Sequence, residues 1–450
     1  MSSLLVGPQQ SNGKWPEEAQ ERAATEPLNL PRHWTIKPLK HVAQINPDAL
    51  DDTTDPNFEL EYVDIGNVDS LGKITDTQLL IFKDAPSRAR RLVTDGDTII
   101  STVRTYLKAI AFVEKPPKSL IVSTGFAVLR PTEIVLPKYL WYVTQSNDFV
   151  QRVVAHSDGV SYPAIPPTEL GTLKVWIPPI PEQKRIIGFL ERETARSDTV
   201  VAQKERLIAL LEEKKVAVVN RAVTEGLNPS VASNTSHIPW FSKVPAHWSH
   251  HKLGYLVRMV SGGTPDKANA EYWRGTIPWV SPKDMKSRAI ADSEDHVSAL
   301  AVEETGLKII DAPAVLIVVR GMILAHTFPV GLTEKPVTIN QDMKALTDFH
   351  LCSGEFLAHL LAGLASVMLA HVEEAAHGTK CLRTDQWEGI EVFLPGKDEQ
   401  DKICEWIADA IANIDLTAAK IDRQIRKLRE YRAALISLAV TGRCPTERGN

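Results

Sequence analysis

An internal repeat limits the folds open to this chain more than any other feature of its sequence. A shift of 217 residues places one stretch of the sequence on a later one without a gap, starting with Pro178 and Pro395. The superposed residues are Pro178 with Pro395, Glu182-Gln183 with Glu399-Gln400, Ile186 with Ile403, Asp198 with Asp415, Arg206 with Arg423, Ile208 with Ile425, Leu211 with Leu428, and Ala222-Val223-Thr224 with Ala439-Val440-Thr441. A register kept over this length predicts a duplicated structural unit.

A second pair of related segments lies upstream of each copy. The sequence LPRHWTIKPLKHVAQI surrounds Trp34, and VPAHWSHHKLGYLVRM surrounds Trp248. The chain therefore divides into a globular segment, a helical segment, and a second copy of each. The expected parts are an arm at 1–29, globular domains at 30–176 and 230–391, and helical regions at 177–229 and 392–450. The arm either is mobile or completes the fold beside the second helix.

The helical regions carry a heptad pattern of apolar residues. The second follows alternating steps of four and three residues, interrupted by one charged residue, Arg432, and the first keeps the same register with more polar substitutions. The residues expected to pair the helices are Leu190, Val201, Ile208, Leu211, Val218, Ile407, Ile411, Ile414, Ile421, Ile425, Leu428 and Leu435. Two such helices in one chain favour an antiparallel coiled coil, which relates the globular domains by a pseudo-two-fold axis.

The ends of both helices are marked at equivalent places. Pro181-Glu182 and Asp398-Glu399 suit helix starts, and Gly226 and Gly442, each followed by a proline three residues later, suit helix ends. Two lysines, Lys204 and Lys215, occupy positions of the apolar seam. Each either extends its ammonium group to solvent or pairs with an acid of the opposing helix or of a partner.

The globular segments are expected to be α+β. Short β-branched runs bounded by turn residues predict strands within 92–104, 109–115 and 314–326, and 138–154 has a helical pattern. The most apolar stretch, 356–372, is short for a membrane span and contains His359, so it is expected to be a buried helix.

Composition sets wider limits. A chain of 450 residues is too long for one ordinary core, and a net charge of −5 gives no sign of a nucleic-acid partner, so any DNA-binding surface must be local. The four cysteines, Cys352, Cys381, Cys404 and Cys444, form no CxxC pair, which argues against zinc or disulfides and fits a reducing cytoplasm. The N-terminus lacks the pattern of a signal peptide.

Motifs of catalysis are missing from the sequence. No glycine loop ends in Gly-Lys-Ser/Thr, because Gly13-Lys14 is followed by Trp15. No Asn/Asp-Pro-Pro-aromatic element of a base methyltransferase occurs, and Pro265-Asp266 has no spaced acid-x-Lys partner of a nuclease. We therefore expect no catalytic residues, no metal site and no cofactor in this chain.

The order of these parts, with Glu-Gln opening each helix, resembles the specificity subunits of Type I restriction-modification systems. Residues 261–285, SGGTPDKANAEYWRGTIPWVSPKDM, are similar to that family's Gly-Thr-Pro, Tyr-Trp-x-Gly, Ile-Pro-Trp-Val and Asp-Met pattern. The first domain departs from it: Ile45-Asn46-Pro47-Asp48 stands near the Gly-Thr-Pro position, and LEYVDIGNVDSLGKI replaces the Trp-Val segment. Such divergence is expected if the two domains read different DNA.

The resemblance implies two target-recognition domains that each dock in a major groove of double-stranded DNA and read a split target. It also implies helices that bind two methyltransferase subunits, which carry S-adenosylmethionine and modify adenine N6, and a separate restriction and translocase subunit that uses ATP and Mg. The alternatives are the recognition subunit of another multi-subunit DNA modification system, a coiled-coil scaffold that binds no DNA, and a self-sufficient nuclease or methyltransferase.

Basic and aromatic residues in both globular domains are the candidates for DNA contact. Arginine can pair with guanine O6 and N7, and lysine is suited to phosphates. The candidates are Lys83, Arg88, Arg90, Arg91, Arg104, Tyr106 and Lys108 in the first domain, and Lys267, Arg274, Lys283, Lys286 and Arg288 in the second. Three other aromatic residues, Tyr62, Trp273 and Trp279, are expected to pack in the domain cores.

Overall fold

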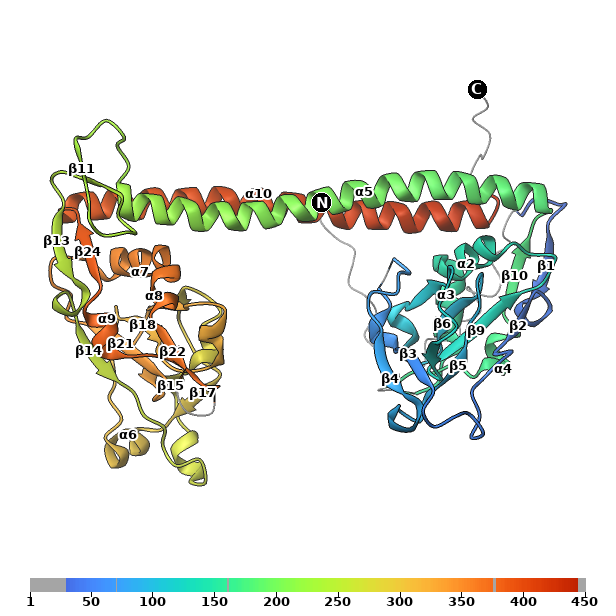
Figure 1. Cartoon of the computed structure of the whole chain (residues 1–450), viewed down its shortest axis with the longest axis horizontal. Coiled ribbons are helices and arrows are strands. Elements are labelled where there is room, and N and C mark those ends of the chain that lie inside the picture. The colour runs from blue at the N-terminus through green and yellow to red at the C-terminus, as the bar shows by residue number, and fades with distance from the viewer. Residues whose placement is uncertain (1–29, 70, 160–161, 375–377, 444–450) are drawn as a thin grey trace, which may run out of the picture. The chain divides into compact units, whose positions relative to one another are not determined.

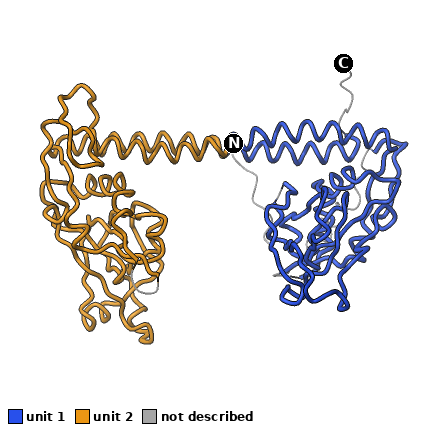
Figure 2. Tube along the Cα trace, in the orientation of Figure 1, with its two compact units in different colours: residues 1–204, 423–450 blue, residues 205–422 orange. Residues whose placement is uncertain are grey.

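The structure, a computed structural model, describes residues 30–69, 71–159, 162–374 and 378–443. The chain divides into two compact units, 1–204 with 423–450, and 205–422 (Figure 2). Each unit contains one globular domain, the first half of one long helix and the second half of the other. The arm expected at 1–29 lies outside the described residues.

The globular domain of the first unit contains two four-stranded sheets and a short β-ribbon. The ribbon pairs β1 (Thr35–Pro38) with β10 (Lys174–Ile177). One sheet has the order β2 (Ala43–Ile45), β9 (Phe126–Pro131), β6 (Thr98–Ser101), β7 (Ile110–Phe112), and the other β4 (Gln78–Ile81), β3 (Glu59–Val63), β8 (Leu120–Ser123), β5 (Ala89–Leu92). Every residue of β6 and of β8 is buried, which explains their continuous β-branched and apolar sequences. The helices are α2 (Pro137–Gln145), α3 (Asn147–Ala155) and α4 (Pro167–Leu170).

The domain of the second unit repeats this plan with additions. Its ribbon pairs β13 (Ser249–Lys252) with β24 (Glu391–Leu394). The five-stranded sheet has the order β14 (Arg258–Ser261), β21 (Met343–Thr347), β18 (Val315–Val318), β19 (Val330–Thr333), β16 (Ala289–Ile290), and the three-stranded sheet β17 (Asp295–Val297), β15 (Ile277–Val280), β20 (Thr338–Ile339). Two further ribbons pair β11 (Ser233–Thr235) with β12 (Lys243–Pro245), and β22 (Val372–Glu374) with β23 (Lys380–Leu382). The helices are α6 (Ala299–Thr305), α7 (Gly354–Gly363), α8 (Ala365–Ala370) and α9 (Thr384–Glu388).

The offset of 217 residues extends further towards the N-terminus than the sequence alone indicates. Strands β6 and β18, helices α2 and α7, and strands β10 and β24 all begin at residues separated by that number. The parallel pair β3–β8 of the first domain likewise matches the parallel pair β15–β20 of the second. The predicted α+β fold of two similar domains is confirmed.

The apolar stretch 356–372 packs inside the second domain, as expected, although it forms two helices where one was predicted. Helix α7 ends at Gly363 and α8 starts at Ala365, and most side chains of α7 are buried. Among the described helices, none combines the length and the apolar character that a membrane crossing needs.

The two long helices, α5 (Ile180–Glu225) and α10 (Lys397–Val440), run antiparallel within each unit (Figure 1). Within the first unit Asp198 Oδ1 lies 3.1 Å from Arg432 Nε, and Lys204 Nζ donates to Gln424 Oε1 at 2.6 Å. The partner's number falls as the first number rises, which defines the antiparallel direction and confirms the predicted coiled coil. Leu190, Val201, Ile407, Ile414, Ile421, Ile425 and Leu435 are buried, and the other predicted seam residues, Ile208, Leu211, Val218, Ile411 and Leu428, are half-buried.

The repeated glutamine joins each helix start to its own domain. Gln183 is fully buried, its Oε1 accepts from Leu136 N at 2.8 Å, and its Nε2 donates to the carbonyls of Ile134 and Pro178 at 3.0 and 2.9 Å. The three bonds satisfy backbone groups that would otherwise be buried without partners. Gln400 makes the same bonds to Ser353 N, Leu351 O and Pro395 O at 2.9, 2.8 and 2.9 Å.

The repeated Pro-x-His-Trp segment joins the same domain to the end of the other helix. His33 Nε2 lies 2.8 Å from Glu182 Oε2 at the start of α5. Gly442, at the end of α10 with φ of +70°, faces Pro31 and Trp34 so closely that a Cβ atom would lie 2.5 Å from the proline ring. In the second unit, His247 lies 2.7 Å from Glu399, and Gly226 faces Trp248 and Pro245. Each domain is thus held at one helix start and one helix end.

Candidate nucleic-acid interface

A capped turn follows the equivalent strands β3 and β15. Asp64 N donates to Asn67 Oδ1 at 2.9 Å after β3, and Ser281 N donates to Asp284 Oδ2 at 2.9 Å after β15. The divergent segment LEYVDIGN therefore forms the same strand and turn as IPWVSPKD. The two domains therefore present different side chains on a shared backbone at this turn.

Arg88 supports this turn in the first unit. Its Nε donates to Tyr62 Oη at 3.1 Å, and its Nη2 lies 2.5 Å from Asp64 Oδ2. Both contacts raise the pKa of the guanidinium, the hydrogen bond to Tyr62 most, followed by the charge of Asp64. Tyr62 is buried, as expected for a core residue. Arg88 is exposed but is already engaged by an acid of its own domain.

The remaining basic residues near β5 differ in exposure. Lys83 is exposed on the short turn after β4, and the Arg90 guanidinium carbon lies 4.7 Å from the centroid of the Phe82 ring. Arg91 is half-buried, burial lowers its pKa, and its Nε has no hydrogen-bond partner among the described residues. Lys83 therefore presents accessible charge, whereas Arg90 and Arg91 are both half-buried.

The turn between β6 and β7 brings three candidates together. It is a 3₁₀ turn, Thr105–Leu107, flanked by Arg104 and Lys108, whose φ angles are +49° and +54°. Tyr106 is 54% exposed, and Lys108 Nζ donates to Asn147 Oδ1 at 3.2 Å. The Arg104 guanidinium carbon lies 4.7 Å from the centroid of the Tyr162 ring. Cationic and aromatic groups thus share one exposed turn.

The Gly-Thr-Pro loop of the second unit is fixed by tryptophans. Trp279 is buried and its Nε1 donates to Gly263 O at 2.9 Å, and the half-buried Trp273 meets it edge-on with ring centroids 5.0 Å apart. Gly262 has no room for a side chain, since a Cβ atom would lie 2.2 Å from the Ile339 carbonyl oxygen. The candidates Lys267 and Arg274 are exposed on this loop, which the two tryptophans hold in place.

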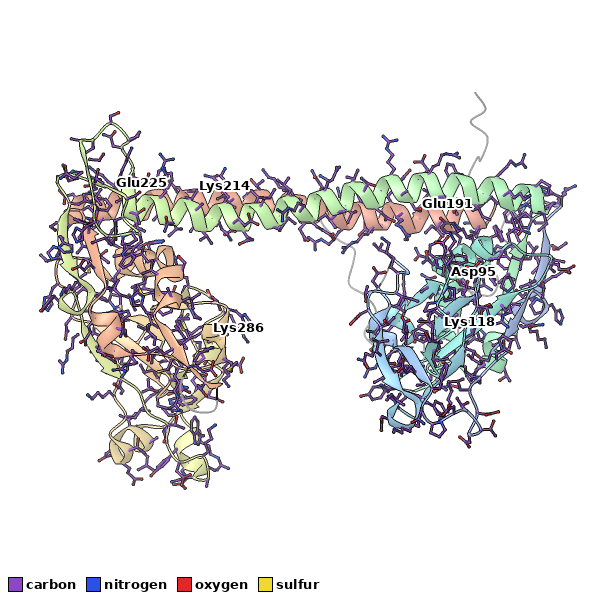
Figure 3. The ribbon with its side chains drawn as sticks, viewed as in Figure 1. Asp95, Lys118, Glu191, Lys214, Glu225 and Lys286 are labelled. Atoms are coloured by element: carbon purple, nitrogen blue, oxygen red, sulfur yellow. The ribbon has the colours of Figure 1, made fainter. Side chains whose placement is uncertain are left out.

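The other candidates of the second unit are engaged within it. Lys283 lies 2.8 Å from Asp295 and 3.2 Å from Glu294, and Lys286 is 3.2 Å from Glu294. The side chains of all four residues are exposed, and Lys286 is labelled in Figure 3. Such ion pairs contribute little stability, so either lysine can exchange its carboxylate for a phosphate at small cost.

Arg288 is half-buried, and its side chain points inward instead. Its guanidinium contacts the ring of the buried His359, and burial lowers the pKa of both groups, that of His359 to about 3. Glu355, His359 and Cys404 hold potential metal-ligand atoms within 4.8 Å of one another, but the fixed positive charge of Arg288 in the same cluster opposes a metal cation. The position of Arg288 near the Trp-Val segment in sequence did not indicate that its side chain points inward.

One exposed arginine was missed. Arg320 follows β18 at the start of the second unit's equivalent of the Arg104 turn, and no ion pair or side-chain hydrogen bond joins it to the described residues. The gapless sequence repeat begins only at Pro178 and so gave no signal for this residue. The structure extends the 217-residue offset to β6 and β18, which places Arg320 at the position of Val103, next to Arg104.

Comparison with known proteins agrees with this architecture. The family model described as Type I restriction modification DNA specificity domain matches residues 31–208 and 245–427. These matches cover most of the chain and one falls on each repeat, so the chain belongs to the family of Type I restriction-modification specificity subunits.

Sequence identity to individual relatives is low. The chain is 32% identical to the Type I restriction enzyme EcoR124I/EcoR124II specificity subunit of Escherichia coli over 154 residues, 34% of this chain and only 38% of that protein. It is 22% identical to the HindI specificity subunit of Haemophilus influenzae over 374 residues, 70% of this chain and 80% of that protein. A solved structure described as "Structural basis underlying complex assembly and conformational transition of the type I R-M system" covers 93% of this chain and 100% of its own, with 24% identity and a TM-score of 0.67. That likeness establishes the fold.

Proposed function

We propose that this chain is the DNA sequence-recognition subunit of a Type I restriction-modification complex and reads a split target, one half with each globular domain. The observation that carries the proposal is the duplicated joint, in which Gln183 and Gln400 make the same three hydrogen bonds in two units. Because both domains are attached to the helices in the same way, we infer that they have the same role, and that each reads its own half of the DNA target.

The distribution of charge supports DNA as the ligand. The chain carries a net charge of −5, so attraction to DNA has to come from local groups such as Lys83, Arg104 and Lys108 in the first domain and Lys267 and Arg274 in the second. Lysines and arginines at turns reach phosphates and base edges in a groove, and exposed aromatic side chains add contact area. The ion-paired lysines Lys283 and Lys286 would serve phosphates.

The outer faces of the long helices are suited to protein partners. The exposed large apolar side chains of α5 and α10 outside the seam are Leu207, Leu210, Val216, Trp406, Leu416, Tyr431 and Leu438. We assign this surface to two methyltransferase subunits and a restriction and translocase subunit, which would carry S-adenosylmethionine, ATP and Mg in the cytoplasm. Catalysis belongs to those partners, and this chain directs them to the target.

A domain exchange tests the proposal. Residues 30–176 are replaced by the corresponding domain of another specificity subunit, and the complex with the neighbouring methyltransferase is assayed for the sequence it modifies. We expect one half of the target to change and the other half to stay the same, and the reciprocal exchange of 230–391 to change the other half. A target altered in both halves by one exchange would contradict independent reading, and modification that needs no part of this chain would favour a scaffold.

A further inference from the structure

The exposed turn at Arg104 has a counterpart with equivalent backbone hydrogen bonds in the second unit. Arg104 N donates to Pro163 O at 2.8 Å, and Leu107 N donates to Arg104 O at 2.9 Å. The corresponding bonds of the second unit run from Gly321 N to Lys380 O at 2.9 Å and from Leu324 N to Gly321 O at 3.2 Å. Arg104 and Gly321 are separated by the repeat offset and hold the same place in the turn.

The residue at this place needs a positive φ. Gly321 has φ of +134° and ψ of 163°, a conformation essentially restricted to glycine. Arg104 has φ of +49° and ψ of 47°, in the left-handed helical region, which costs a residue with a side chain on the order of 1 kcal/mol compared with glycine. Glycine is therefore the residue that the backbone favours, and the second unit has it. The first unit has an arginine there despite this cost. The requirements of the fold do not explain the arginine, so we infer that its guanidinium serves binding.

The Arg104 side chain is held in place without being neutralised. Its guanidinium lies over the ring of Tyr162, which is 65% exposed, and no described carboxylate forms an ion pair with it. Arg88 of the same domain, by contrast, is paired with Asp64. A guanidinium stacked by its face keeps its N–H edge available, and fixing it beforehand lowers the entropic cost of binding.

We propose that Arg104 specifies a guanine in the half-site read by the first domain, by donating two hydrogen bonds to guanine O6 and N7 in the major groove. Tyr162 is the positioning residue that holds the guanidinium plane. This assignment rests on the proposed function, because it needs the domain to lie on DNA. Bidentate pairing is the strongest form of guanine recognition open to an arginine, and a single planar donor edge on an exposed turn provides it.

The test uses Arg104→Gly, which introduces the residue found at the equivalent place. Lys115→Gly is the matched control, because Lys115 is exposed, has φ of +45° and lies outside the proposed contact surface of the same domain. Each variant is assembled with the neighbouring methyltransferase, and adenine methylation is mapped at single-base resolution on a library of targets. We expect Arg104→Gly to reduce the preference for guanine at one position of one half-site about tenfold or more, with no loss of thermal stability, and Lys115→Gly to keep the full motif.

Further variants separate reading from structure. Tyr162→Phe keeps the stacking ring and should keep the guanine preference, whereas Tyr162→Ala should weaken it. An unchanged motif with Arg104→Gly, or weaker modification of all targets without a change in base preference, would overturn the assignment and leave the proposed function standing. If the wild-type complex shows no split motif that depends on this chain, the proposed function itself fails.

Discussion

Asp198 on α5 and Arg432 on α10 form an ion pair at 3.1 Å within the first unit, and the same pair recurs in the second unit with the helices exchanged. Subtracting the repeat offset from Arg432 gives Lys215, and adding it to Asp198 gives Asp415, and these two side chains lie 2.7 Å apart. Arg432, the charged residue that interrupts the apolar seam, therefore belongs to an ion pair that occurs once in each unit. It fixes the register of two helices whose apolar residues alone allow shifts by a heptad.

Removing the charge of Asp198 from the ion pair of the first unit should destabilise the coiled coil strongly. The Arg432 side chain is 9% exposed, so Asp198→Asn leaves a buried charge without its partner, which costs about 3 kcal/mol. Asp415→Asn should cost less than about 1 kcal/mol, because Lys215 is 23% exposed and retains Glu212 at 3.0 Å. Calorimetric unfolding of both variants measures the difference. Equal losses of unfolding free energy in the two variants would show that burial of the arginine is irrelevant. The double variant Asp198→Leu with Arg432→Leu should recover much of the stability that Asp198→Asn loses.

The buried glutamine of each joint should be essential for the attachment of its domain. Gln183→Ala leaves the Leu136 N–H and two carbonyls without partners, with an expected cost of about 3 kcal/mol to the first unit. Amide hydrogen exchange should speed up at Leu136 and stay unchanged at Ser353, and Gln400→Ala should give the opposite pattern. The exposed Gln203→Ala on the same helix is the control. Protection of Leu136 that survives in Gln183→Ala would refute the role given to the joint.

Acid should weaken the second unit through His359. Burial lowers its pKa from 6.5 to about 3, so the folded unit keeps the ring neutral while the unfolded chain takes up a proton below pH 6.5. Stability is therefore complete above pH 6.5 and falls as the pH drops, by about 2 kcal/mol at pH 5. His359→Gln should remove this slope, whereas the exposed His350→Gln should keep it. Unfolding free energies measured between pH 5 and 7 decide the matter, and an unchanged slope in His359→Gln would contradict the prediction.

Arg320 should act on the half-site of the second domain alone. It is exposed at the turn equivalent to that of Arg104, beside Met322, which is 63% exposed. Arg320→Ala should weaken modification or relax one base of the second half-site by about tenfold, without a change in the first. Mapping the modified motif measures this effect, with Lys335→Ala, a surface residue paired with Asp292, as the control. A change confined to the first half-site would mean that the domains do not read separately.

The sequence predicted the long-range order of the fold better than its local details. The repeat, the helix ends and the antiparallel pairing follow from periodic features that one sequence contains. Strands were predicted within 92–104, and β6 (Thr98–Ser101) is one of them, but β5 ends at Leu92. Between them the buried Asp97 carboxylate accepts from Thr94 N at 2.8 Å and forms a turn. Likewise 138–154 forms two helices, since Ser146 caps the second. Local side-chain bonds outweighed the pattern.

The candidate site was predictable by region but not by residue. A run of basic residues shows that charge is present and not which way each side chain points: Arg104 reaches the surface, whereas Arg288 turns inward to His359. Arg320 stands alone in an apolar sequence and so escaped a search for clusters. Comparison of the two units at the repeat offset identifies it, because that comparison uses backbone position and not composition.

The most direct measurement of the central claim is a map of adenine methylation across the host genome, made with and without this chain and with the neighbouring methyltransferase present in both cases. The proposed function predicts one split motif, two short specified halves separated by unread bases, that disappears when this chain is deleted. Methylation of the same sites in its absence would contradict the claim that this chain reads the target.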